Sequence, residues 1–176
     1  IAGNWSQQAY VKASNSAVND TFGQSVALSS DGNTLAVGAR TQGGSGAAYI
    51  FTRSGGNWAE QAFLKASNAQ AGDLFGWSLA LSGDGNTLAV GAPSESSAIT
   101  GVRPGLVDET TAGNGASSSG AVYVYTRSGA VWSQQAYVKP SNTDSDFFGW
   151  SLALSADGNR LAVGAPALEP RGVPEP

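Results

Sequence analysis

The chain has 176 residues, the length of an ordinary domain, and 41% of them are hydrophobic, which is enough for a sizeable core. It contains 24 Gly but only 12% charged residues, a balance that favours short strands joined by tight turns over long exposed helices. The formal charge of -4 argues against nucleic acid as a partner, and the absence of Cys and His excludes thiol nucleophiles, disulfides, imidazole bases and the usual zinc ligands.

The first predicted element is an outer strand over residues 5–14, WSQQAYVKAS. It returns as WAEQAFLKAS from Trp58 and as WSQQAYVKPS from Trp132. Apolar and polar residues alternate in these copies with the period of two that a strand requires. A polar loop follows each copy. No segment approaches the roughly 20 apolar residues of a membrane-spanning helix, so the sequence predicts no membrane insertion.

A hairpin that begins with Phe-Gly follows in each repeat. It reads FGQSVALSSDGNTLAVGAR over 22–40, FGWSLALSGDGNTLAVGAP over 75–93 and FGWSLALSADGNRLAVGAP over 148–166. The central Ser-x-Asp-Gly-Asn sequence combines an Asp that can form an Asx turn with a Gly that can adopt positive φ. Two short antiparallel strands are therefore predicted in each copy.

The next predicted strand is rich in aromatic and β-branched residues, GAAYIFTRSG from Gly46 and GAVYVYTRSG from Gly120. The distance from Trp5 to Trp58 is 53 residues, whereas that from Trp58 to Trp132 is 74, because 93–119 carries an insertion of about 21 residues. The insertion is rich in Gly and Ser and has no apolar period. We expect it to form an exposed, mobile loop.

Four short strands in a repeat of about 53 residues are typical of β-propeller blades. The Phe-Gly pairs at 22–23, 75–76 and 148–149, with Gly-Ala-Pro at 91–93 and 164–166, resemble FG-GAP repeats, the units of integrin-α-like propellers. Gly-Ala-Arg at 38–40 departs from the pattern at its last residue. The resemblance implies an all-β fold of four-stranded antiparallel blades, with about two and a half to three blades in this chain.

The repeats divide the chain without breaking it into separate domains. A single array spans 1–176 and consists of repeat 1 at about 5–57, repeat 2 at about 58–131 with the insertion 93–119, a partial repeat 3 at about 132–166 and a Pro-rich tail at 167–176.

Many FG-GAP blades bind calcium through several oxygen ligands in one loop, which makes Asp31, Asp84 and Asp157 the candidate metal ligands. Calcium usually takes six to eight oxygens with several charges among them. Each turn here offers one carboxylate, so a structural turn is favoured and no cofactor is predicted, with calcium as the alternative.

Other candidate residues lie in loops. Arg103, Asp108 and Glu109 of the insertion predict a binding loop. Weaker metal candidates pair Asp108 with Glu109 or Asp144 with Asp146, and solvated loop carboxylates are the alternative.

Two further residue types suggest surface roles. Asn4 and Asn19 match the short N-glycosylation pattern. Repeated aromatic residues could line a carbohydrate or peptide surface, although blade packing is the more common role; these are Tyr10, Tyr137, Trp77 and Trp150.

The sequence places no carboxylate pair at a defined separation, so no enzyme is predicted. Fewer than four blades cannot close a ring, which leaves a longer propeller or association of copies.

The resemblance implies an extracellular or cell-surface module for adhesion or self-assembly, with itself or a surface protein or glycan as partner. The alternatives are a subunit of an extracellular filament and part of a propeller-borne polysaccharide lyase or hydrolase. Val-Pro-Glu-Pro at 173–176 resembles the start of a PEP-CTERM sorting signal, which implies a released or surface-displayed protein, and a Pro-rich linker is the alternative.

Overall fold

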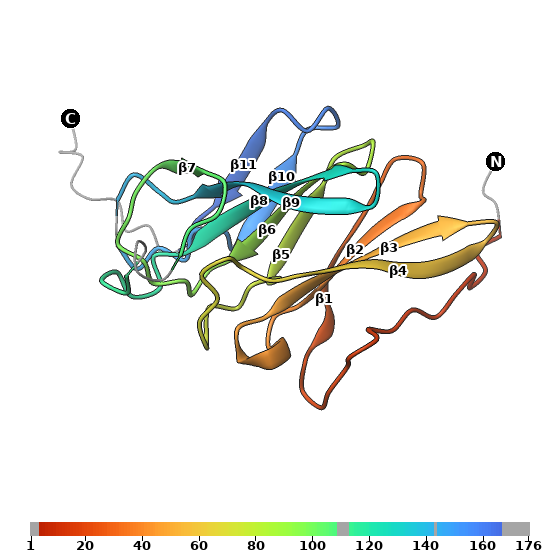
Figure 1. Cartoon of the computed structure of the whole chain (residues 1–176), viewed down its shortest axis with the longest axis horizontal. Coiled ribbons are helices and arrows are strands. Elements are labelled where there is room, and N and C mark those ends of the chain that lie inside the picture. The colour runs from red at the N-terminus through yellow and green to blue at the C-terminus, as the bar shows by residue number, and fades with distance from the viewer. Residues whose placement is uncertain (1–3, 109–112, 143, 167–176) are drawn as a thin grey trace.

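The computed structural model describes residues 4–108, 113–142 and 144–166, and it consists mainly of antiparallel β-sheet (Figure 1). Three sheets follow one another along the chain, and the predicted all-β fold with four-stranded blades is confirmed. Within the described ranges, no helix is long and apolar enough to cross a membrane.

The first blade is a four-stranded meander in which each strand pairs with the next one along the chain. A short 3-10 helix, η1 (Gln42–Gly44), connects its second and third strands. The strands are β1 (Phe22–Leu28), β2 (Thr34–Ala39), β3 (Ala47–Ser54) and β4 (Asn57–Leu64).

The second blade repeats this order and adds a fifth strand from the insertion. Its four repeated strands are β5 (Ser78–Leu81), β6 (Thr87–Ala92), β8 (Ala121–Ser128) and β9 (Val131–Val138). The added strand β7 (Val102–Pro104) pairs with β9 at the outer edge of the sheet.

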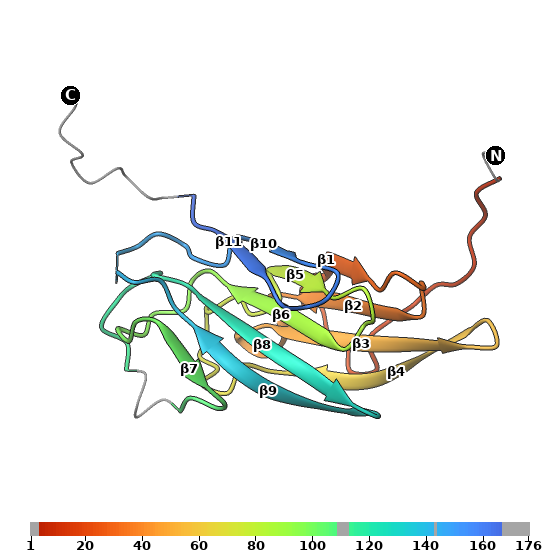
Figure 2. The ribbon, with the colours of Figure 1, turned by 90° about the horizontal axis from the view of Figure 1, so that it is seen from above.

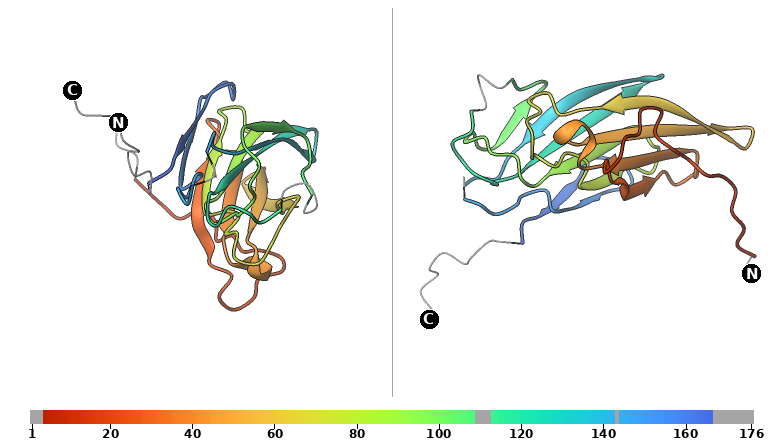
Figure 3. Two further views of the ribbon diagram at one scale, coloured as in Figure 1. Left: turned by 90° about the vertical axis from the view of Figure 1, so that its left-hand side faces the viewer. Right: turned by 90° about the horizontal axis from the view of Figure 1, so that it is seen from below.

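The third sheet is the hairpin of β10 (Ser151–Leu154) and β11 (Leu161–Gly164), which lies along one flank of the molecule (Figure 3). Seen from above, β1, β5 and β10 lie toward one side, and β4 and β9 lie toward the other (Figure 2). We call β1, β5 and β10 the inner strands. Each sheet begins at a Phe-Gly hairpin. A repeat counted from Trp5 begins instead with the Trp segment, so the blades are offset by one strand from the sequence repeats.

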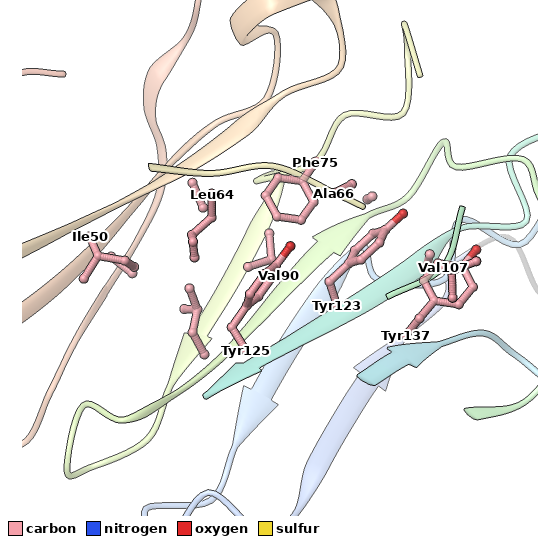
Figure 4. Close-up of a cluster of buried hydrophobic side chains, with 14 residues drawn as sticks. Ile50, Leu64, Ala66, Phe75, Val90, Val107, Tyr123, Tyr125 and Tyr137 are labelled. Carbon is pink, nitrogen blue, oxygen red and sulfur yellow. The ribbon is translucent and has the colours of Figure 1, made fainter. Parts of the chain in front are cut away.

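The main hydrophobic core lies between the first and second blades (Figure 4). Ile50 and Leu64 of the first blade face Val90 and the aromatic rings of β8. Phe75, from the Phe-Gly pair, is fully buried, and its ring centroid lies 5.2 Å from that of Tyr123. Phe75 therefore packs at the junction between the first two blades.

The glycines of the repeat are required by close main-chain contacts. Gly76 has φ of +88°, and a Cβ at this position would overlap the carbonyl oxygen of Ala47. A Cβ on Gly38 would in turn overlap the carbonyl oxygen of Gly76. Neighbouring blades can approach this closely only because both positions lack a side chain.

Residues 5–14, predicted as a strand, form none. Trp5 and Tyr10 are highly exposed, and the segment is held by side chains instead: Ser14 N–H donates to Glu60 at 2.9 Å, and Tyr49 Oη donates to Asn15 at 2.6 Å. The corresponding strands β4 and β9 pair with β3 and β8. The described residues contain no such neighbour for 5–14, and a strand requires one.

Candidate functional site

The predicted metal ligands each lie in the turn of an inner hairpin. Asp31 accepts hydrogen bonds from Ser29 Oγ at 2.6 Å and from the main-chain and side-chain nitrogens of Asn33 at 2.9 and 3.0 Å. The Ser29 hydroxyl, followed by Asn33, lowers the pKa of Asp31 to about 2, and equivalent bonds lower the pKa of Asp84 and Asp157. The described part of the chain contains no cluster of three or more Asp, Glu, His or Cys that could hold a metal.

The same turns connect neighbouring blades through their main chains. Ser30 N–H donates to Gly83 O at 2.9 Å, and Gly83 N–H donates to Ala156 O at 2.8 Å. The residue between Ser and Asp in each turn therefore belongs to a ladder that runs across the three hairpins.

A second series of contacts connects the inner strands. Ser25 Oγ donates to Gly76 O at 2.8 Å, and Ser78 Oγ donates to Gly149 O at 2.6 Å. Each serine thus bonds to the Phe-Gly glycine of the following blade, and the contact recurs at both junctions.

The first blade ends the stack with an open apolar face. Val26 and Leu28 of β1 are 64% and 55% exposed. Their counterparts one repeat later, Leu79 and Leu81, are partly buried against the core between the blades. The exposed pair therefore occupies positions that are covered wherever a preceding blade is present.

The aromatic residues that could line a ligand surface have different surroundings. Tyr137 is fully buried, whereas Tyr10 is 77% exposed. The rings of Trp77 and Trp150 have centroids 4.5 Å apart, and the Arg40 guanidinium lies 4.7 Å from the Trp77 centroid. Tyr137 is therefore a core residue that packs against Tyr123 of the same blade, and the two tryptophans pack against each other between the second and third blades.

The connections β2–β3, β4–β5, β6–β8 and β9–β10 form one edge of the stack, which we call the loop face. A buried ion pair lies beneath it: Lys139 Nζ is 2.7 Å from Glu95 Oε2 and donates to Ser119 Oγ at 2.5 Å. Asn68 donates to the other Glu95 oxygen at 2.9 Å and accepts a bond from Tyr123 Oη at 2.6 Å. Burial lowers the pKa of Lys139, although Glu95 opposes this effect.

The first blade has a neutral version of this arrangement. Lys65 Nζ donates to the main-chain oxygens of Gln42 and Gly46, both at 2.8 Å, and to Ser45 Oγ at 3.1 Å. Gln42 occupies the position of Glu95, two residues after the Gly-Ala-x end of the hairpin. Sequence reasoning missed this site, although the Lys that precedes Ala-Ser-Asn or Pro-Ser-Asn in every repeat was the available signal.

The described part of the insertion is packed against its neighbours, which corrects the expectation of an exposed loop. Val107 is buried, and its N–H donates to Ser67 Oγ at 3.1 Å. Gly105 N–H donates to Gln135 O at 2.8 Å, beside β7. The insertion is held in place because its strand β7 adds to the edge of the existing sheet. The Gly- and Ser-rich composition of the insertion did not indicate this strand.

The predicted binding-loop residues are only partly placed. Arg103 lies on β7 opposite Tyr137, and both Arg103 and Asp108 are exposed. Glu109 lies outside the described residues. The structure therefore puts Arg103 on the outer edge of the second blade.

The remaining candidates also lie in loops. Asn142 Nδ2 donates to Asp144 at 3.2 Å and to the buried Asp146 at 2.9 Å, so an amide joins the two carboxylates. Asn4 and Asn19 are both exposed. The segment 173–176 lies outside the described residues.

A family model described as FG-GAP repeat matches residues 5–51 and 58–125. A comparison with curated proteins found no match. Among solved structures, the crystal structure of TolB from Acinetobacter baumannii is similar, with 16% sequence identity and a TM-score of 0.30 over 82% of this chain. The chain spans 38% of the length of that TolB chain.

Proposed function

The chain belongs to the FG-GAP repeat family, and we propose that it is a non-catalytic β-propeller module that binds further copies of itself end to end. We place it outside the cell or at the cell surface, because FG-GAP repeats are typical of proteins found there. The observation that carries the proposal is the complementarity of the two ends of the blade stack.

The serine contacts and the main-chain ladder could both continue beyond the two ends of the stack, because one end carries the donors and the other carries the acceptors. On the third hairpin, the residues equivalent to the donors of the earlier blades offer Ser151 Oγ and Ala156 N–H. On the first blade, the residues equivalent to the acceptors of the later blades offer Gly23 O and Ser30 O. A second copy with its β1 beside β10 would continue both series. Such a contact is head-to-tail, and it closes a ring or extends a filament according to its rotation.

The apolar surface supports the same arrangement. Val26 and Leu28 would become buried like their counterparts in the second blade, and burial of apolar area is the main driving force of association. Each chain supplies three inner hairpins, so two copies would align six. Closed propellers have about four to eight blades, so a closed pair is the simplest assembly.

The test is the mass of the 176-residue chain in solution, measured by light scattering over a range of concentrations. The wild type should pass from 17.7 kDa to twice that mass or to larger multiples. Leu28→Lys should stay monomeric, and Leu106→Lys, which alters a still more exposed leucine on the insertion, should associate like the wild type. A wild type that remains monomeric at all concentrations, or a Leu28→Lys variant that associates normally, would refute the proposal.

Adhesion through the loop face is the second candidate. It is favoured by the insertion, which is anchored on the buried Glu95–Lys139 pair and yet presents Arg103 and Leu106 to solvent. Binding to a glycan array that Arg103→Ala weakens and Arg160→Ala leaves unchanged would support this candidate, with Arg160 as an exposed control in the β10–β11 turn.

A further inference from the structure

An apolar groove of about 520 Å³ lies between the second blade and the β10–β11 hairpin. Val124 and Val138 line it from the blade, and Leu161 and Val163 line it from β11. β11 pairs with β10 along one edge, and within the described ranges no strand pairs with its other edge. We call this space the acceptor groove.

The corresponding space one blade earlier is filled by aromatic side chains. In the alignment of the repeats, the residues one blade earlier that correspond to Val124, Val138, Leu161 and Val163 are, in that order, Ile50, Leu64, Leu88 and Val90. All four belong to one buried cluster with two residues of β8, Tyr123 and Tyr125 (Figure 4).

The Phe-Gly phenylalanine completes both spaces. The Phe75 centroid lies 5.2 Å from that of Tyr123 and 6.2 Å from that of Tyr125, with the rings edge to face. Its counterpart Phe148 lines the acceptor groove. The groove therefore offers the same aromatic contact to a strand beside β11.

Polar groups at the end of the groove are repeated as well. Two residues beyond Tyr125, Arg127 donates through Nε to Asn86 Oδ1 at 2.9 Å and through Nη1 to Gln61 Oε1 at 3.2 Å. The counterparts Asn159 and Gln135 both line the acceptor groove. The β3 strand shows the same recognition, because Arg53 donates through Nε to Asn33 Oδ1 at 3.0 Å and through Nη1 to Gln8 Oε1 at 2.9 Å.

We infer that the acceptor groove binds an extended strand of a partner polypeptide with the pattern aromatic-x-aromatic-x-Arg, added antiparallel to β11. The two aromatic rings would fill the apolar walls, and the Arg would reach Asn159 and Gln135. The segments of this chain with that pattern, 49–53 and 123–127, already pair on both edges within their own sheets. This site goes beyond the proposed self-association because it needs no second copy of the chain.

The direct test is a fluorescently labelled peptide with the sequence of residues 120–129, GAVYVYTRSG, titrated with the 176-residue chain and followed by anisotropy. Saturable binding with one peptide per chain is expected. A peptide carrying both Tyr123→Ser and Tyr125→Ser should bind about 100-fold more weakly, because it loses both aromatic anchors. A peptide carrying Arg127→Gln should bind about tenfold more weakly, because its bonds lose their charge assistance.

Variants of the chain locate the binding. Val163→Lys places a charge in the groove and should weaken binding of the unaltered peptide at least about tenfold. Asn159→Ala, in an exposed turn, removes one of the two Arg acceptors and leaves the apolar walls unchanged. It should reduce the discrimination between the unaltered peptide and the peptide carrying Arg127→Gln, which keeps the test valid if Val163→Lys does not fold. Equal binding of the Tyr and Ser peptides, or no saturable binding at all, would overturn the inference.

The self-association variant separates this inference from the proposed function. Leu28→Lys alters the opposite end of the stack, so it should bind the peptide as tightly as the wild type while remaining monomeric. A wild type that associates but binds no peptide overturns the acceptor groove alone. A wild type that binds the peptide but never associates overturns the proposed function alone.

Discussion

Glu95 and Lys139 form an ion pair of 2.7 Å in which the two side chains are 2% and 0% exposed, although 44 residues separate them in the sequence. Glu95 comes from the beginning of the insertion, and Lys139 directly follows β9. The pair therefore ties the insertion to the outer strand of the second blade, at the place where the first blade uses only neutral partners for Lys65.

Replacing Glu95 tests what this pair contributes. Glu95→Ala should lower the free energy of unfolding by about 3–5 kcal/mol, because it leaves Lys139 buried without its countercharge. Gln42→Ala at the equivalent position should cost less than about 1 kcal/mol, since Lys65 contacts the main-chain oxygen of Gln42, which the substitution keeps. Urea denaturation measures both values. Equal losses in the two variants would show that the charge pair adds nothing specific.

Two glycines with nearly the same φ separate the cost of a positive φ from the cost of close blade contact. Gly72 and Gly76 have φ of +93° and +88°, but only Gly76 has a main-chain oxygen, that of Ala47, where a Cβ would lie. Gly72→Ala should cost about 1–2 kcal/mol from backbone strain alone. Gly76→Ala should cost more than about 4 kcal/mol or prevent folding. Thermal and urea unfolding would contradict the proposed contact if both variants lost the same stability.

Buried tyrosines make the fold sensitive to alkali. Burial raises the pKa of Tyr49 to about 12, and it raises the pKa values of Tyr123, Tyr125 and Tyr137 further above their usual value of 10. Because the folded-state pKa values exceed the unfolded ones, the unfolded chain releases these protons first. The stability that they contribute is complete below pH 10 and should decline as the pH rises from 10 through 12. Tyrosinate absorbance should therefore appear together with loss of circular dichroism, and stepwise ionisation in a folded chain would contradict this.

Calcium should have little effect on stability. Each turn carboxylate already accepts hydrogen bonds from its own Ser and Asn, as Asp31 does from Ser29 and Asn33. Addition of millimolar calcium, or of a chelator, should shift the melting temperature by less than about 1 °C. A saturable rise that Asp31→Asn, Asp84→Asn and Asp157→Asn together abolish would instead establish these turns as calcium sites.

Local pattern was sufficient to predict the hairpins. Alternating Leu, Val and Ala on either side of Ser-x-Asp-Gly-Asn specify two short strands and a turn without help from distant residues. The turn role of Asp31 could likewise be inferred, because all of its hydrogen-bond donors lie within two residues of it.

The missed features depend on distant neighbours. The sequence of residues 5–14 closely matches that of β9, yet only the latter is a strand, because only the latter has β8 beside it. The insertion shows the converse, since Val102 and Pro104 form a strand through pairing with β9 despite a loop-like composition. The acceptor groove could not be read from any one repeat, because its walls come from two blades.

The ladder formed by Ser30, Gly83 and Ala156 has a consequence for how such an array can grow. Three different residue types occupy the same position, and the ladder bonds use only main-chain N–H and C=O groups. A duplicated repeat inserted into the gene would therefore bring its own connection to both neighbours without any compensating substitution at that position. Proline, which lacks the N–H, would interrupt the ladder there.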